Sequence, residues 1–158
     1  MSGVLLDKFS LDRGDLDLTA LSASLPEWVF YDETRPEEVK ERIKEAEVVI
    51  SNKVVLDWSV LNAAKRLKLI CIAATGTNNV DLATAKELGI NVCNVRSYAT
   101  PSVVQHVFSL ILALSTRLNE YQRAVEEGLW GKSTQFCLLD FPIHEISGKT
   151  LGIVGYGE

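Results

Sequence analysis

The chain has 158 residues, of which 47% are hydrophobic and 23% are charged, and its formal net charge is −5. This composition is typical of a protein that folds around a hydrophobic core, and it excludes disorder along the whole chain. The acidic balance gives no cationic field for a phosphate backbone or an anionic membrane surface, so we expect neither nucleic acid nor membrane as a partner.

Short apolar segments alternate with amphipathic stretches along the first hundred residues. This alternation is typical of parallel βαβ units. We expect five strands, at Val4–Asp7, Trp28–Tyr31, Val48–Ser51, Leu69–Ala73 and Ile90–Cys93. Five strands with intervening helices predict an α/β domain of about 100 residues with a flavodoxin-like, doubly wound parallel sheet.

Capping signals precede the helices between these strands. Thr34 followed three residues later by Glu37 resembles a capping box and predicts a charged surface helix over residues 38–46. Asp57 and Asp81 are expected to cap the next two helices, because an aspartate side chain accepts hydrogen bonds from the free amides of a first turn.

The longest predicted element follows the fifth strand. Thr100 as N-cap and Pro101 at the first helical position predict a helix that runs to about Glu127. Its apolar residues cover more than one face, so the helix is expected to be buried between domains or between subunits.

The last residues resemble the start of a dinucleotide-binding fingerprint. Thr150–Val154 reads as a buried strand that leads to Gly155 and Gly157, the first two glycines of GxGxxG. The helix and the acidic residue that complete such a fingerprint do not follow within the chain. A glycine turn after any buried strand is the alternative interpretation.

Two loops are expected at the carboxyl ends of the strands, where open α/β sheets bind their ligands. Lys53 and Val54 follow the third strand, and Thr75, Gly76 and Thr77 follow the fourth. Consecutive amides of Thr75, Gly76 and Thr77 could form an anion-binding concavity, and Lys53 would add a cation at the same edge. Together these features suit a small carboxylate. The alternative is an ordinary Asn/Gly turn beside an exposed lysine.

Cysteine and histidine usage predicts no metal site. The three cysteines form no CxxC pair, and those within apolar strands are expected to pack as small hydrophobic residues. The two histidines, His106 and His144, lie far apart in the sequence. No secretory signal precedes the first strand, so a cytoplasmic location is expected.

Several segments together carry a family resemblance. They are SNKV at 51–54, ATGTNNVDL at 74–82, TPSVVQH at 100–106 and GKTLGIVG at 148–155, and they occur in family order. The chain resembles the D-isomer-specific 2-hydroxyacid dehydrogenases, and within them the glycerate dehydrogenase or hydroxypyruvate reductase branch. The ATGTNNVDL and TPSVVQH segments are more specific than the glycines at the end.

The resemblance implies NAD- or NADP-dependent interconversion of a 2-keto acid, of the hydroxypyruvate or glyoxylate type, and its D-2-hydroxy acid. It also implies that residues 1–100 form the N-terminal part of the substrate domain. Residues 101–158 would then contain the crossing helix and the start of a Rossmann-type NAD-binding domain. The resemblance also implies a homodimer through the helix of residues 101–127, which agrees with its apolar residues on more than one face.

Site residues are implied by the same resemblance. The expected substrate-binding residues are Lys53, Val54, Thr75, Gly76 and Thr77. The expected cofactor-binding residues are Thr75, Thr100, Val103, Gly155 and Gly157.

The family's catalytic Arg, Glu and His follow the dinucleotide fingerprint, and neither His106 nor His144 matches that histidine. We therefore expect the protein that contains this chain to be a dehydrogenase, and the 158 residues alone to be inactive and without tight NAD binding. A non-catalytic small-ligand sensor or corepressor on the same scaffold is the alternative. A receiver domain is disfavoured because Asp7 is followed by Lys8 rather than by further acidic residues.

Overall fold

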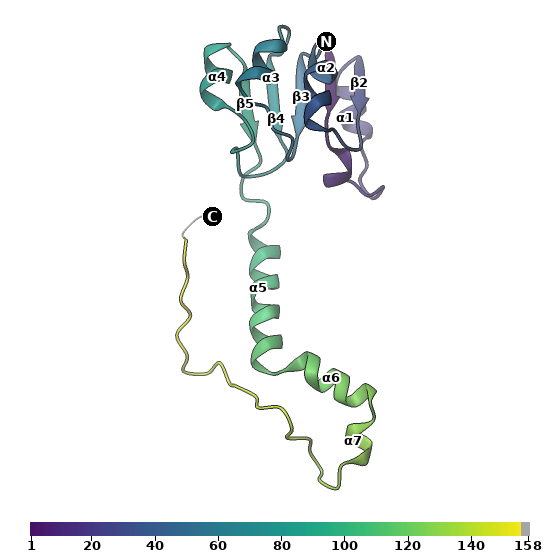
Figure 1. Ribbon diagram of the computed structural model, residues 1–158, viewed down its shortest axis with the longest axis vertical. Helices are drawn as coiled ribbons and strands as arrows, with labels where there is room; N and C mark the ends of the chain where they lie inside the picture. The colour runs from purple at the N-terminus through teal and green to yellow at the C-terminus, as the bar shows by residue number, and fades with distance from the viewer. Residues whose placement is uncertain (156–158) are drawn as a thin grey trace. The chain divides into compact units, whose positions relative to one another are not determined.

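The computed structural model describes residues 1–155, in two compact units (Figure 1). The first unit ends at Arg96 and the second begins at Ser97. The two units are described separately below.

The first unit contains a five-stranded parallel sheet. Its strands are β1 (Ser2–Leu5), β2 (Glu27–Phe30), β3 (Val48–Ser51), β4 (Leu69–Ile72) and β5 (Asn91–Asn94). Their order across the sheet is β2-β1-β3-β4-β5, and every pairing is parallel. This is the flavodoxin-like order, and the predicted fold class is confirmed.

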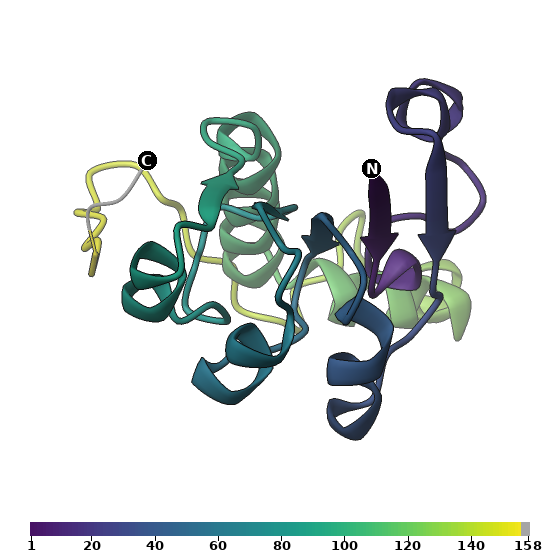
Figure 2. The ribbon, with the colours of Figure 1, turned by 90° about the horizontal axis from the view of Figure 1, so that it is seen from above.

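Helices cover the two faces of this sheet unequally. The first unit contains α1 (Thr19–Ser24), α2 (Val39–Ile43), α3 (Trp58–Ala63) and α4 (Leu82–Glu87), with short 3₁₀ helices η1 (Lys8–Ser10) and η2 (Pro36–Glu38). Figure 2 shows α2, α3 and α4 on one face and α1 on the other. Apolar side chains of α2, α3 and α4 form the core together with alternate residues of β1, β3 and β4.

The burial pattern of the strands reflects this asymmetry. Val49 and Ile70 point into the core and are fully buried, whereas Ile50 and Leu69 alternate with them and remain half-buried. No residue of α1 is buried. The sheet therefore derives most of its hydrophobic stabilisation from the face that α2, α3 and α4 cover.

The caps of α3 and α4 form as predicted, but the cap before α2 does not. Asp57 accepts a hydrogen bond from the Val60 amide and Asp81 accepts one from the Thr84 amide. Before α2, the Glu38 carboxylate accepts from the Arg35 amide, one residue later than the predicted Thr34/Glu37 pair. The reason is that the Thr34 hydroxyl donates to the carbonyl of Leu6, which holds this loop against the end of β1.

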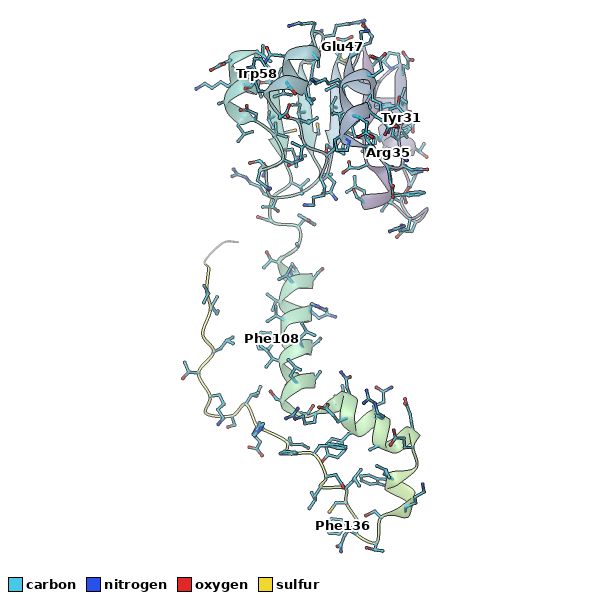
Figure 3. The ribbon with its side chains drawn as sticks, viewed as in Figure 1. Tyr31, Arg35, Glu47, Trp58, Phe108 and Phe136 are labelled. Carbon is cyan, nitrogen blue, oxygen red and sulfur yellow. The ribbon has the colours of Figure 1, made fainter. Side chains whose placement is uncertain are left out.

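A buried acid, Glu47, lies at the end of the sheet where the strands begin (Figure 3). Glu47 is 7% exposed and binds Lys68 at 2.7 Å and Arg66 at 3.3 Å. The hydrogen bond from Lys68 is the main reason that the pKa of Glu47 lies below its usual value. This ion cluster joins the start of β3 to the segment that enters β4.

The second unit contains three helices in place of the single long helix that the sequence predicts. They are α5 (Thr100–Ser115), α6 (Leu118–Glu126) and α7 (Leu129–Lys132). The prediction of one helix to Glu127 is wrong because Arg117 adopts a left-handed backbone with φ of 54°, and the Thr116 hydroxyl bonds back to the Leu112 carbonyl. The N-cap of α5 is Ala99, so Thr100 is the first helical residue rather than the cap.

The helix α5 has no buried residue in the structure. The burial expected for its apolar faces therefore does not occur within the described chain, and burial between subunits stays a prediction. Within residues 1–155, no helix is both long enough and apolar enough to cross a bilayer.

The segment after α7 is irregular. The Tyr121 hydroxyl donates to the carbonyls of Leu138 and Phe141, which ties the segment to α6. The strand predicted at Thr150–Val154 is not formed, and Val154 is fully exposed. A strand needs a hydrogen-bonded neighbour, and no partner strand pairs with this segment in the described residues.

Gly3 allows the close approach of an aromatic ring on the neighbouring strand. It lies opposite Trp28 in the register of β1 and β2, and a Cβ atom at Gly3 would stand 2.6 Å from Cε3 of that indole. Gly3→Ala is therefore expected to lower the free energy of unfolding by roughly 1–3 kcal/mol, because the ring must move away. Urea denaturation monitored by circular dichroism measures the change.

The matched control is Gly131→Ala, because a Cβ atom there would meet nothing within 4 Å. This substitution should not lower stability. In a Trp28→Leu background the cost of Gly3→Ala should shrink, since the indole is then absent. An equal cost in both backgrounds would show that contact with Trp28 is not its cause.

Candidate functional site

Three loops meet at the edge of the sheet where the strands end. They follow β1, β3 and β4, which are neighbours in the sheet. Since all the strands are parallel, their carboxyl ends lie at one edge, and β1 and β3 flank the point where the strand order reverses. Ligands of doubly wound folds bind at such a point.

The loop after β3 is bound to the end of β1. The Asp7 carboxylate accepts hydrogen bonds from the amides of Asn52, at 2.9 Å, and Lys53, at 2.7 Å. The Asn52 side chain also donates to the Ser10 hydroxyl at 3.0 Å. Sequence reasoning missed this role for Asp7. The available signal was an acid at the end of the first strand in a fold whose order places β1 beside β3.

The loop after β4 is bound in turn to the loop after β3. Asn79 is 9% exposed, and its side-chain amide donates to the Val54 carbonyl at 3.1 Å. The Leu56 amide donates to the Asn79 carbonyl at 2.8 Å, and the Asp81 amide donates to the Leu56 carbonyl at 3.0 Å. The predicted residues Lys53 and Val54 therefore lie on a loop that is joined directly to the loop of Thr75, Gly76 and Thr77. Asn79 was not predicted as a site residue.

The amides of the second loop remain available as donors. In residues 1–155, the backbone N–H groups of Thr75, Gly76 and Thr77 have no hydrogen-bond acceptor. Thr75 and Gly76 are exposed, and the Asn94 side chain holds this segment by donating to the Thr75 carbonyl at 2.7 Å. Free N–H groups in a held loop can bind a carboxylate oxygen without competing with bonds of the fold.

A cavity of about 680 Å³ opens beside the first of these loops. Its ionisable lining includes the cations Arg13 and Lys53 and the acids Asp7, Asp32, Glu33 and Asp57. The pKa of Asp57 is lowered, mainly by the hydrogen bond from the Ser59 hydroxyl and then by the Val60 amide. Val54 lines the cavity, whereas Thr75, Gly76 and Thr77 do not.

The predicted cofactor residues are divided between the two units. Thr75 lies in the first unit, while Thr100, Val103 and Gly155 lie in the second. Thr100 and Val103 belong to the first turn of α5. Gly155 has a φ of 100°, which suits a tight turn that other residues rarely form. Gly157 lies outside the described residues.

Thiols do not build a metal site here. In the described part of the chain, no group of three or more His, Cys, Asp or Glu side chains could hold a metal ion. Cys71 and Cys93 face each other across β4 and β5 with their sulfur atoms 3.5 Å apart. Burial, with Cys93 beside it, raises the pKa of Cys71 to about 12, so this thiol remains protonated and unreactive near neutral pH.

Known proteins are similar to this chain in sequence and in fold. The glycerate dehydrogenase of Methylorubrum extorquens is 46% identical over 149 residues, which cover 93% of this chain and 48% of that protein. The hydroxypyruvate reductase of Blautia hydrogenotrophica is 39% identical over 161 aligned residues, covering 100% of this chain and 50% of that protein. The chain thus spans about half the length of these curated relatives.

A solved structure and a family model agree with these relatives. The NAD-dependent formate dehydrogenase from Staphylococcus aureus, solved in complex with NAD, superposes with a TM-score of 0.65 at 26% identity, covering 81% of this chain and 41% of that one. The catalytic-domain model of the D-isomer specific 2-hydroxyacid dehydrogenases matches residues 6–143. The chain therefore belongs to the D-isomer-specific 2-hydroxyacid dehydrogenase family.

Proposed function

We propose that this chain forms the substrate-binding part of an NAD(P)-dependent dehydrogenase. The enzyme would interconvert a 2-keto acid, of the hydroxypyruvate or glyoxylate type, and its D-2-hydroxy acid. The observation that carries the proposal is the set of amides at Thr75, Gly76 and Thr77 that have no acceptor within residues 1–155, on a loop that Asn79 joins to the loop of Lys53. The names of the relatives, glycerate dehydrogenase and hydroxypyruvate reductase, support the substrate type.

The substrate carboxylate would accept hydrogen bonds from these amides. A hydrogen bond to a charged group contributes roughly 1.5–3 kcal/mol, and two or three of them orient a small acid as well as hold it. Lys53 would add a cation beside the reacting carbonyl carbon, and Val54 would contribute an apolar wall. In this proposal Thr77 is the last of the three amide donors.

A nicotinamide cofactor would supply or accept the hydride. Thr100, Val103 and Gly155 are the residues we propose for its site, together with Thr75. The positive φ of Gly155 fits a tight pyrophosphate turn. Residues 149–155, however, contain neither a strand nor the start of a helix, so the structural frame of a pyrophosphate site is not formed in the described part.

Proton transfer also needs a group whose pKa lies near the working pH. No histidine lines the cavity of the first unit, and His106 and His144 both belong to the second unit. We therefore propose that the 158 residues alone bind substrate without turning it over.

The function is tested with the whole protein that contains these residues. NADH or NADPH oxidation should follow addition of hydroxypyruvate or glyoxylate, and Lys53→Met should raise KM for the keto acid roughly 10- to 100-fold, since a charge-assisted contact is lost. Lys65→Met is the matched control, because Lys65 is an exposed lysine at the end of α3 and away from the cavity.

Three outcomes would count against this proposal. The first is no reaction with any 2-keto acid. The second is an equal effect of the two lysine substitutions on KM. The third is NADH oxidation by the isolated 158-residue chain above a buffer control, which would refute the proposal that these residues bind without turnover.

We also propose that α5 mediates a homodimer. Val107, Leu110 and Leu114 share one side of this helix, and their exposed fractions are 42%, 50% and 73%. A contiguous exposed apolar face favours burial against another protein surface.

Sedimentation velocity tests the dimer. The chain should sediment as a dimer, and Leu110→Glu should produce a monomer because the carboxylate would be desolvated in the interface. Gln105→Glu places the same charge on the opposite side of α5 and should leave the dimer intact. A wild-type chain that is monomeric at tens of micromolar would contradict the proposal.

A further inference from the structure

Asp7 lies at the point where the strand order reverses. β1 pairs with β2 on one side and with β3 on the other, and Asp7 follows the end of β1 by two residues. Its exposed fraction is 7%, and it lines the cavity that also contains Lys53. A carboxylate at this depth needs hydrogen-bond donors to offset the loss of water.

Those donors come from the loop after β3 rather than from the local chain. One carboxylate oxygen of Asp7 accepts from the Asn52 amide at 2.9 Å, and the other accepts from the Lys53 amide at 2.7 Å and from the Asn52 amide at 3.2 Å. Ser10 reinforces the link, because its hydroxyl donates to the Asp7 carbonyl at 2.7 Å and accepts from the Asn52 side chain at 3.0 Å. Both oxygens of Asp7 are thus engaged by backbone.

The same short loop is also held from its other side. The Val54 carbonyl accepts from the Asn79 side chain at 3.1 Å and from the Ser51 hydroxyl at 3.2 Å. Lys53 therefore lies between two anchors, one on the loop after β1 and one on the loop after β4. Its backbone has little freedom, while its side chain is exposed at the cavity. This arrangement restricts where the ammonium group can be.

We propose that Asp7 is a positioning residue for substrate binding, acting through the backbone of Lys53. It would not contact the substrate, since its negative charge would repel the carboxylate of a keto acid. Without the Asp7 carboxylate, the loop after β3 would lose its hydrogen bonds to the segment that follows β1. The backbone of Lys53, from which the ammonium group extends, would then no longer be held in place. The inference rests on the function proposed above, in which Lys53 contacts the keto acid.

The test is Asp7→Asn in the whole protein. Asparagine has the same shape but only one acceptor oxygen, which is neutral, so at least one of the three hydrogen bonds from the Asn52 and Lys53 amides is lost and the others weaken. The expected result is a rise of roughly 10-fold in KM for the keto acid, with kcat changed less than about threefold and KM for the cofactor unchanged. Ser10→Ala, which removes only the reinforcing bonds, should give a smaller rise in the same direction and tests the link if Asp7→Asn does not fold.

Glu47→Gln is the matched control. Like Asp7→Asn, this substitution replaces a buried acid by its isosteric amide. Glu47, however, lies where the strands begin, and in this account it supports only the fold. It should lower thermal stability and leave KM for the keto acid unchanged. If Glu47→Gln raised this KM as much as Asp7→Asn, general destabilisation would explain both and the inference would be overturned.

A double-mutant cycle distinguishes an effect of Asp7 through Lys53 from an independent effect of Asp7 on substrate binding. If Asp7 acts through Lys53, Asp7→Asn should add almost nothing to KM in a Lys53→Met background, because coupled residues are not additive. Full additivity would overturn the inference. An unchanged KM in a folded Asp7→Asn protein would overturn it as well.

Amide hydrogen exchange measures whether the Asn52 and Lys53 amides are hydrogen-bonded, and it does so without relying on enzyme activity. The Asn52 and Lys53 amides should be protected in the wild type and should exchange faster in Asp7→Asn. Fast exchange in the wild type would overturn the inference directly. Protected amides in a whole protein that reduces no 2-keto acid would instead overturn the proposed function, and with it the substrate role of Asp7, while the hydrogen bonds themselves would stand.

Discussion

The candidate site depends on the parallel pairing of β1 with β3 and of β3 with β4. These pairings place the ends of three strands side by side, so that loops more than twenty residues apart in the chain can exchange hydrogen bonds. Asp7 and Asn79 then link the three loops into one unit, with the loop of Lys53 in the middle. The core under α2, α3 and α4 stabilises the pairing, and the pairing in turn positions the loops.

The electrostatics of this edge are compatible with the proposed binding of a keto acid by an acidic chain. Four carboxylates line the cavity, but three of them have partners in the protein. Asp7 accepts from two amides, Asp57 caps α3, and Asp32 forms an ion pair with Lys8 at 3.7 Å. Backbone N–H groups provide positive potential without changing the net charge of −5. The free donors, which are the amides of residues 75–77 and the Lys53 ammonium group, are therefore the proposed site for an anion.

Local signals in the sequence predicted the elements whose structure depends on local chemistry. The five strands were recognisable because the alternation of strands with helical stretches is strong, and Asp57 and Asp81 cap helices because their side chains reach amides three residues away. The loops of Lys53 and Gly76 followed from the same topology. Their hydrogen bonds to the neighbouring loop did not.

Features that depend on distant or special backbone contacts were missed. Thr34 had the pattern of a cap, but its hydroxyl bonds to Leu6 across the sheet edge. Arg117 gave no signal for a left-handed conformation, since arginine rarely adopts one, and the long helix was therefore overestimated. Asp7 and Asn79 became recognisable as site residues only once β1, β3 and β4 were known to be adjacent.

The central claim is that the amides of residues 75–77 bind the substrate carboxylate beside Lys53. The most direct test is a titration of the ¹⁵N-labelled chain with hydroxypyruvate, followed through its backbone amide resonances. The account predicts saturable shifts that are largest at Thr75, Gly76 and Thr77, with smaller ones in the loop of Lys53. Saturable shifts confined to other segments, or none at millimolar hydroxypyruvate, would contradict it.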